Sequence, residues 1–110
     1  MTSLPRHPID AFMEALHAKK RVRVKFYSAE DSTYVARTCA PMDYGRSRRA
    51  KDPTPRYHFW DFTSDERPHT LSLRPEQLLS IEILESQFDP ATFVTWRPAW
   101  IVPRDWGPYS

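Results

Sequence analysis

The fold of this chain is decided by the stretch Arg56-Tyr57-His58-Phe59-Trp60-Asp61-Phe62 and by residues 69–85, which read HTLSLRPEQLLSIEILE. The first run is aromatic and alternating, and it lies between Pro55 and the turn-forming residues 64–68. Such a pattern is typical of a strand followed by a turn. A second strand, His69–Leu73, is predicted at hairpin distance from the first.

The residues after this hairpin predict one tight turn and a further strand. Pro75 presets φ near the helical value, so residues 74–77 are expected to form a single 3₁₀ turn. From residue 78 to residue 85 an alternating pattern resumes. The apolar residues expected on one face of this strand are Leu79, Ile81 and Ile83. Strand, hairpin, strand, 3₁₀ turn and strand form the closing half of a small SH3-like or Sm-like barrel, which predicts a mainly β fold.

Length and composition bound the class of protein. The 110 residues suffice for one domain that is stable without disulfides. Cys39 is the single cysteine, and its neighbours favour a small buried residue over a nucleophile. The N-terminus lacks an apolar segment of signal-peptide length, and no stretch approaches a membrane span, so we expect no membrane partner and a cytoplasmic location.

Charge is distributed unevenly along the chain. Residues 1–56 hold 12 Lys and Arg against 6 Asp and Glu, and residues 57–110 hold 4 against 8, so the halves carry +6 and −4. This asymmetry indicates either a basic face for an anionic partner or charges that meet across the fold. With two glycines, Gly45 and Gly107, the chain has neither a GxGxxG motif nor a P-loop.

One amphipathic helix is predicted from Pro8 to Lys20, ahead of the barrel. Pro8 suits the first helical position, and the lysines at the end complement the helix dipole. Its apolar stripe consists of Ile9, Phe12, Met13 and Leu16. A helix with a single apolar stripe lies against another element, which here is the barrel.

A strand with a basic outer side is predicted next, over residues 21–27. Valines and a phenylalanine alternate with polar residues, which places the apolar side chains inward. Its outward side chains are Arg21, Arg23, Lys25 and Tyr27. Such a ladder either tracks a phosphate backbone and stacks a base, or it protects a solvent-facing or edge strand from aggregation.

A long strand from Thr33 to Met42 and a basic loop are predicted to follow. Pro41 must lie at the strand's end, at a bulge or on an edge, because it cannot donate to a ladder. Residues 43–56 lack an apolar period and predict a mobile loop. The loop's cations are Arg46, Arg48, Arg49, Lys51 and Arg56, with Arg37 on the strand before them. They form a phosphate-contact patch or serve solubility alone.

The order of these elements resembles the WYL domain, an Sm-like or SH3-like module found mostly at the C-terminal side of bacterial transcription regulators. The residues that carry the resemblance are Val24-Lys25-Phe26-Tyr27, Arg37-Thr38-Cys39-Ala40-Pro41, residues 57–62, Leu71-Ser72-Leu73 and Ile81-Glu82-Ile83. The resemblance implies a sensing or regulatory module that binds nucleic acid or nucleotide-like ligands. Since one helix precedes the predicted barrel, we expect any DNA-reading domain to come from a partner.

Residues 89–110 go beyond the family pattern and predict an extended Trp/Pro-rich tail, separate from a barrel domain over residues 1–88. The tail's three tryptophans are Trp96, Trp100 and Trp106. So much aromatic area indicates that the tail packs back on its own barrel, or that it clamps a second subunit or a protein partner. Arg97 and Arg104 are candidates to stack on these rings or to meet acidic residues.

The motifs argue against an enzyme. Asp61, His58 and His69 allow a metal or acid–base site to be drawn, but strand histidines are more often structural. The chain has no HxxxH or CxxC spacing and no serine in a nucleophile elbow. We therefore expect no catalytic residue, no metal and no cofactor.

Two functional hypotheses remain. The first is a regulatory module that binds nucleic acid or a nucleotide-like anion through a basic and aromatic face. Its contact residues are Arg21, Arg23, Lys25, Tyr27, Arg37, Arg46, Arg48, Arg49, Lys51, Arg56 and Tyr57. The second is a protein-interaction or homodimerisation module that acts through Trp96, Trp100 and Trp106.

Overall fold

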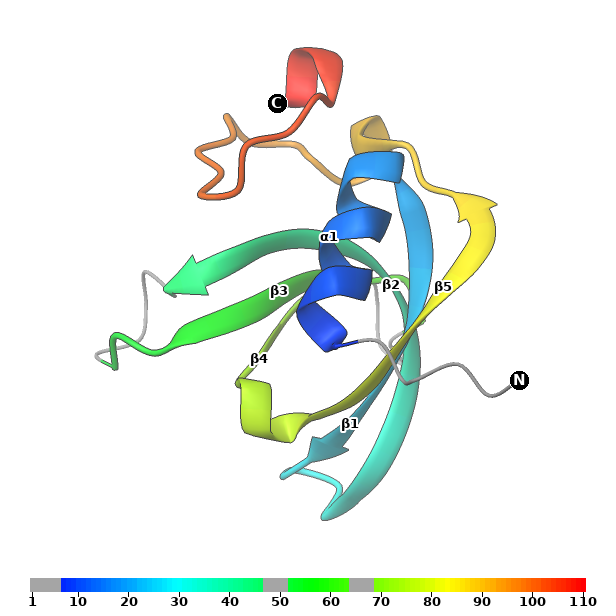
Figure 1. The fold of residues 1–110 in the computed structure, drawn as a ribbon, viewed down its shortest axis with the longest axis vertical. Helices are drawn as coiled ribbons and strands as arrows, with labels where there is room; N and C mark the ends of the chain where they lie inside the picture. Colours follow the sequence, from blue (N-terminus) through cyan, green and yellow to red (C-terminus); the bar gives the residue numbers. More distant parts are fainter. Residues whose placement is uncertain (1–6, 47–51, 64–68) are drawn as a thin grey trace.

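The structure is a computed structural model that describes residues 7–46, 52–63 and 69–110. A bent antiparallel sheet wraps around one helix, and the C-terminal residues run across the end of that helix (Figure 1). The elements are α1 Pro8–Ala18, β1 Lys20–Ser28, β2 Thr33–Arg46, β3 Pro55–Asp61, β4 His69–Leu73, η1 Pro75–Gln77, β5 Leu78–Gln87, η2 Pro90–Thr92 and η3 Gly107–Tyr109. The mainly β prediction with a single α-helix is confirmed for the described part of the chain. No helix there is long and apolar enough to cross a membrane.

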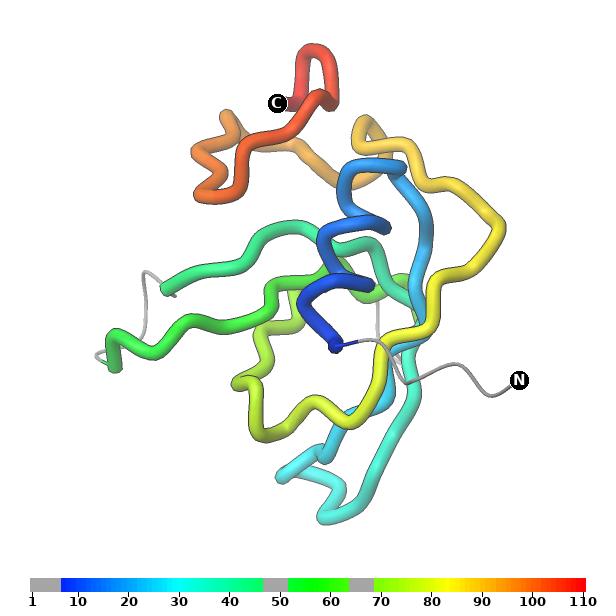
Figure 2. Tube along the Cα trace, in the orientation of Figure 1, coloured from blue at the N-terminus to red at the C-terminus, as the bar shows by residue number. Residues whose placement is uncertain are grey.

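The five strands form one sheet in the order β4-β3-β2-β1-β5. The prediction of a closed barrel is wrong, since no pairing joins β4 to β5 among residues 7–46, 52–63 and 69–110. The turn η1 leads from β4 into β5, which pairs with β1 from its first residue, Leu78, opposite Phe26. Consequently β4 and β5 lie at opposite edges of an open sheet. The tube in Figure 2 shows how strongly the chain curves around the helix.

The helix begins where its sequence predicts, and it ends slightly earlier. The His7 side chain accepts from the Ile9 N–H, and Pro8 occupies the first turn. Lys19 adopts a left-handed conformation with φ 55° and ends the helix, so the expected extension to Lys20 is wrong. The buried face of α1 consists of Ala11, Phe12, Ala15 and Leu16.

Strand β1 has the expected alternation of buried and exposed side chains. Val22, Val24 and Phe26 are buried, whereas Arg23 and Lys25 are exposed. Because β1 lies between β2 and β5, it is not an edge strand, and its cations face solvent from the middle of the sheet.

Strand β2 is longer than expected, and it contains a bulge. The pairing register with β3 shifts between Pro41 and Asp43, which confirms a bulge at the proline. Past the bulge β2 continues to Arg46, so the predicted start of the loop at residue 43 is wrong. The predicted end of the loop at Arg56 is also wrong, because Arg56 belongs to β3. The part of that loop over residues 47–51, like the turn over residues 64–68, lies outside the described residues.

Strand β5 exposes one residue that was expected inside. Its register with β1 shifts between Lys25 and Phe26, and the shift places Leu78 rather than Leu79 opposite Phe26. Leu78 is half-buried and Leu79 is exposed, whereas Ile81 remains half-buried on the inner face. The local irregularity of the ladder therefore overrides the period-2 pattern at the start of the strand.

The core extends beyond residue 88. Trp106 is 2% exposed, and its indole N–H donates to the Leu16 carbonyl at the end of α1 over 2.9 Å. Phe88 and Phe93 contact the Trp106 ring at centroid distances of 5.4 and 6.5 Å. The division of the chain into domains 1–88 and 89–110 stays a prediction.

Candidate functional site

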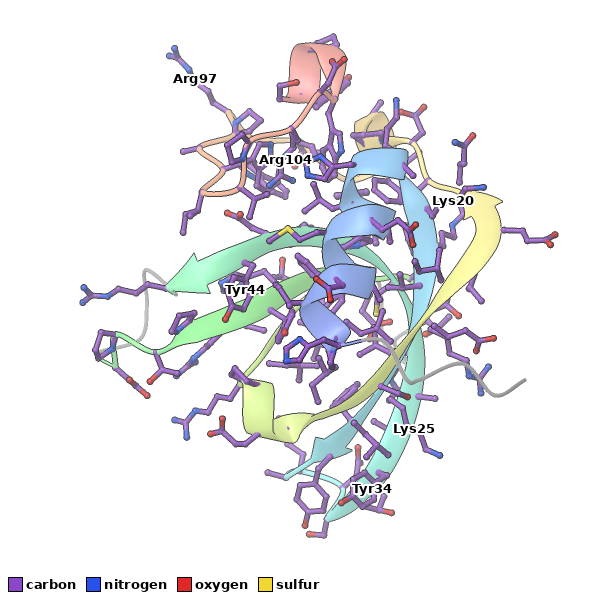
Figure 3. The ribbon with its side chains drawn as sticks, viewed as in Figure 1. Lys20, Lys25, Tyr34, Tyr44, Arg97 and Arg104 are labelled. Atoms are coloured by element: carbon purple, nitrogen blue, oxygen red, sulfur yellow. The ribbon has the colours of Figure 1, made fainter. Side chains whose placement is uncertain are left out.

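The outer face of β1 and β2 combines exposed tyrosines with exposed cations. Tyr27 and Tyr34 are paired across the hairpin, and their rings make an edge-to-face contact at 5.5 Å. They are 39% and 57% exposed. Lys25 and Arg23 continue this row along β1, because residues two apart in a strand share a face. Figure 3 shows Lys25 and Tyr34 at one end of the molecule, far from Arg97 and Arg104 of the C-terminal segment. We call Arg23, Lys25, Tyr27 and Tyr34 the outer row.

Three acids near the outer row reduce its positive charge, namely Glu82 of β5 and the exposed Glu30 and Asp31 of the turn between β1 and β2. Glu82 of β5 lies opposite Arg23, whereas Ser80 lies opposite Lys25. The hairpin tip is fixed by the Ser28 hydroxyl, which donates to the Asp31 carboxylate over 2.9 Å. The row can therefore contact one or two phosphates and stack a base, which suits a flexible single strand better than a rigid duplex.

Arg21, Arg37 and Tyr57 are directed elsewhere. The Arg21 guanidinium lies 5.2 Å from the centroid of the Phe62 ring. Arg37 pairs with Val24, whose side chain points inward, and its guanidinium lies 3.7 Å from the buried carboxylate of Asp61. Tyr57 is buried, and burial raises the pKa of its hydroxyl. Its ring packs against α1 and is not accessible to a ligand.

The remaining predicted cations belong to the far end of the β2–β3 hairpin. Gly45 pairs with Arg56, and Arg46 pairs with Pro55. The buried Nε of Arg56 has no hydrogen-bond partner among the described residues. The other predicted loop cations, Arg48, Arg49 and Lys51, lie outside the described residues. The predicted basic face is thus divided among the outer row, the sheet interior and this hairpin.

The three tryptophans of the C-terminal segment differ in environment. Trp106 is buried, Trp100 is half-buried, and Trp96 is 42% exposed. The rings of Trp100 and Trp106 meet edge to face with centroids 5.5 Å apart, and the Arg104 guanidinium lies over both, 4.2 Å from the centroid of Trp100 and 4.4 Å from that of Trp106. Arg104 therefore stacks on the tryptophans, one of the two roles expected for it from the sequence.

Asp43 anchors this segment to the sheet, a role that the sequence did not reveal. Its carboxylate accepts from the backbone N–H groups of Ile101 and Val102, each at 3.0 Å, and lies 3.4 Å from the Arg104 guanidinium. Arg104 also donates to the carbonyls of Met42 and Val102. Burial lowers the pKa of Arg104 to about 10, and the Asp43 carboxylate opposes this shift. We call Asp43, Arg104 and the rings of Trp100 and Trp106 the clasp.

The histidines are held by hydrogen bonds or strand pairing. Gly45 O lies 3.0 Å from His58 Nε2, which must donate to this carbonyl, and the Ser72 hydroxyl lies 2.8 Å from Nδ1. His69 pairs with Asp61 across β3 and β4. Within residues 7–46, 52–63 and 69–110, no three His, Cys, Asp or Glu side chains are grouped to hold a metal ion.

Comparison with known proteins gives one kind of match. No family model matches the chain, and no curated protein matches it in sequence. Among solved structures the chain is similar to proteasome accessory factor B/C (PafBC) of Arthrobacter aurescens. The TM-score is 0.59 at 16% sequence identity, and the match covers 84% of this chain and 13% of PafBC. The likeness supports a WYL-like fold.

Proposed function

We propose that this protein is a non-enzymatic regulatory or sensing module that binds single-stranded nucleic acid through the outer row. The observation that carries the proposal is the exposed pair Tyr27 and Tyr34 in line with Lys25 and Arg23. Its fold likeness to PafBC, a regulator, is compatible with this role.

The chemistry of the outer row explains the choice of ligand. Two exposed aromatic rings at the hairpin end offer faces on which bases stack, and stacking tolerates any base. Successive residues of the row are separated by about 6.7 Å, twice the rise per residue of a strand, so the row is extended like the backbone that it would contact. Lys25 and Arg23 supply the charge for phosphates, and Glu82 limits that charge beside Arg23.

The test is the binding of a fluorescent oligothymidylate, measured by anisotropy at several salt concentrations. If both cations of the row contact phosphates, Arg23→Ala with Lys25→Ala lowers the slope of log affinity against log salt by about 1.4. Tyr27→Ala and Tyr34→Ala each weaken binding about tenfold if each ring stacks one base.

Arg74→Ala is the matched control, because it removes an exposed cation that belongs neither to the outer row nor to the C-terminal segment. The proposal is wrong if the oligonucleotide does not bind at low salt, or if the control variant changes the slope as much as the outer-row variants do. Far-UV circular dichroism of each variant establishes that the sheet is intact.

The alternative, dimerisation or protein binding through the tryptophans of the tail, receives less support. Trp106 and Trp100 contact this chain's own core and Arg104, so Trp96 and Ile101 are left as the exposed apolar groups of the segment. Light scattering of the intact chain and of Trp96→Ala tests this alternative directly. A dimer that dissociates on this single change would favour it over nucleic-acid binding.

A further inference from the structure

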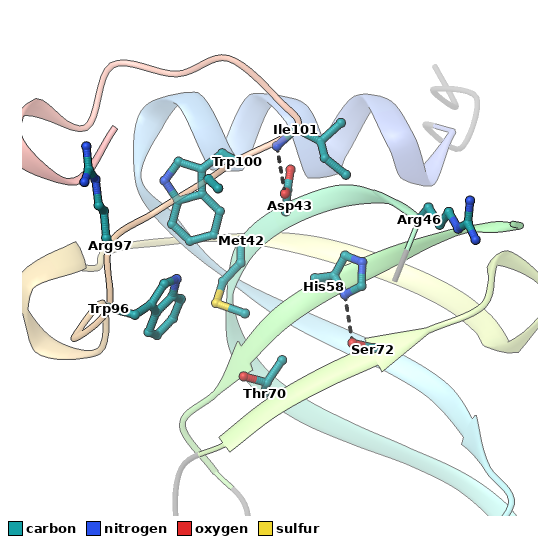
Figure 4. A pocket seen from close by; sticks show the side chains of 11 residues that line it. Met42, Asp43, Arg46, His58, Thr70, Ser72, Trp96, Arg97, Trp100 and Ile101 are labelled. Atoms are coloured by element: carbon teal, nitrogen blue, oxygen red, sulfur yellow. Dashed lines mark hydrogen bonds between the residues drawn. The ribbon is translucent and has the colours of Figure 1, made fainter. Parts of the chain in front are cut away.

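A groove of about 550 Å³ lies between residues 96–101 and the outer side of β2, β3 and β4 (Figure 4). Its volume is in the range of pockets that bind small molecules. It is distinct from the outer row, since none of the outer-row residues lines it.

One side of the groove is aromatic. Trp96 and Trp100 stand edge to face with their ring centroids 6.0 Å apart. The Arg104 guanidinium occupies one face of Trp100, whereas Trp96 is 42% exposed and borders the groove. Trp96 therefore offers the aromatic surface on which a flat ring can stack.

The rim of the groove is positive. Arg97 and Arg46 lie at its two ends, and both side chains extend into solvent (Figure 4). The single acid of the lining, Asp43, is already occupied by two backbone N–H groups and by Arg104. The charges of the lining thus favour an anionic ligand over a cationic one. Its anionic group would meet an arginine at an end of the groove and not at the floor.

The floor is polar and fixed in place. His58 is held between the Gly45 carbonyl and the Ser72 hydroxyl. Thr70 of β4 lies beside it and adds a second hydroxyl below Trp96, and Met42 contributes a soft apolar contact (Figure 4). Because these side chains are already held in place, the floor can hydrogen-bond to the edge of a ligand without a large loss of side-chain freedom.

We infer that this groove binds a small molecule that joins a flat aromatic ring to a phosphate or carboxylate. The ring stacks on Trp96, a polar edge of the ring hydrogen-bonds to Thr70 or Ser72, and the anionic group reaches Arg97 or Arg46. The site and the outer row bind independently of each other, so this inference does not rest on the nucleic-acid proposal.

Calorimetric titration of the intact chain tests the inference with two probes, adenosine 5′-monophosphate and indole-3-carboxylate. Saturable binding of at least one probe supports the inference, and the relative affinities of the two probes indicate which of these ring and anion combinations the groove prefers. Adenosine and inorganic phosphate, which each lack half of the recognised chemistry, should bind at least about tenfold more weakly than the monophosphate. Absence of saturable binding by both probes at their solubility limits overturns the inference.

Substitutions locate the site. Trp96→Ala should weaken probe binding about tenfold or more, and Trp96→Phe should restore most of the loss because it keeps an aromatic face. The double variant Arg97→Ala with Arg46→Ala should weaken the binding of both anionic probes and leave the affinity for adenosine unchanged.

Tyr34→Ala is the matched control, since it removes an exposed aromatic ring of the outer row. It should reduce oligonucleotide binding without affecting either probe. If Tyr34→Ala weakens the probes as much as Trp96→Ala does, the small-molecule site lies on the outer row and the inference is wrong. If the oligonucleotide does not bind but the probes do, the result contradicts the proposed function and not the inference about the groove.

Discussion

Replacement of Arg104 by alanine should cost this small protein a large part of its stability. The Arg104 side chain is 1% exposed, and its guanidinium lies over the rings of Trp100 and Trp106. It donates to two carbonyls and to the Asp43 carboxylate. Alanine leaves the charge of that carboxylate to the backbone N–H groups of Ile101 and Val102 alone. It also leaves a space over the two rings, where the guanidinium was.

The magnitude follows from the imbalance between the two charges. Removing one partner of a buried ion pair typically costs about 3–5 kcal/mol, whereas the intact pair contributes little over an apolar substitute. Burial lowers the pKa of Arg104 and the Asp43 carboxylate raises it, so each charge of the pair depends on the other. We expect Arg104→Ala to lower the free energy of unfolding by about 3–5 kcal/mol. The double variant Arg104→Gln with Asp43→Asn should lose less free energy of unfolding than the two single variants together. Each single variant leaves one buried charge without its partner, whereas the double variant has no charge at either position.

Urea unfolding followed by far-UV circular dichroism measures these differences, because the ellipticity reports the sheet rather than the altered tryptophans. Arg97→Ala, an exposed arginine of the same segment, is the control and should stay within about 0.5 kcal/mol of the parent. Arg104→Lys keeps the positive charge and provides a second, milder variant to measure if Arg104→Ala does not fold. An Arg104→Ala protein as stable as the control would show that the clasp does not hold the segment in solution.

Three further predictions test the interior. Burial raises the pKa of the Cys39 thiol, so the folded protein keeps it protonated; stability should fall as pH rises above about 9, the ordinary value, and Cys39→Ser should flatten that decline in urea titrations. Trp106→Phe removes the hydrogen bond to Leu16 and part of a buried ring, and thermal unfolding should show a loss of about 1–3 kcal/mol. Asp61→Ala leaves the Thr63 N–H without its 2.8 Å acceptor and should cost about 1–3 kcal/mol in the same assay.

The strands were predictable because their patterning is local. In β1, alternation between valines and cations places Val22 and Val24 inside regardless of what the sheet packs against. Pro41 likewise restricted its own position to a strand end, a bulge or an edge, since it has no N–H for the ladder, and the structure has the bulge. Leu79 was misplaced because the shift at Lys25 and Phe26 depends on the register between two strands far apart in sequence.

The candidate sites depended on long-range geometry that no short pattern encodes. Asp43 looks like a loop residue in sequence, yet 58 residues separate it from the backbone that it binds at Ile101. The groove joins Trp96 to Thr70, and the outer row joins Tyr34 to Tyr27 only through the hairpin register. The sequence did name Arg104, together with Arg97, as a candidate to stack on the tryptophans or to meet an acid, and Arg104 does both.

The clasp and the groove are physically one system. Trp100 contacts Arg104 with one face of its ring and lines the groove beside Trp96, so the groove keeps its shape only while Asp43 holds the segment. A ligand in the groove must then stabilise the clasped state by an amount that grows with its concentration relative to its dissociation constant. Loosening the clasp should weaken that ligand and leave the outer row unaffected, since the row is built from β1 and β2 alone. The proposed ligand would therefore be linked to the order of the C-terminal segment and not to the outer row.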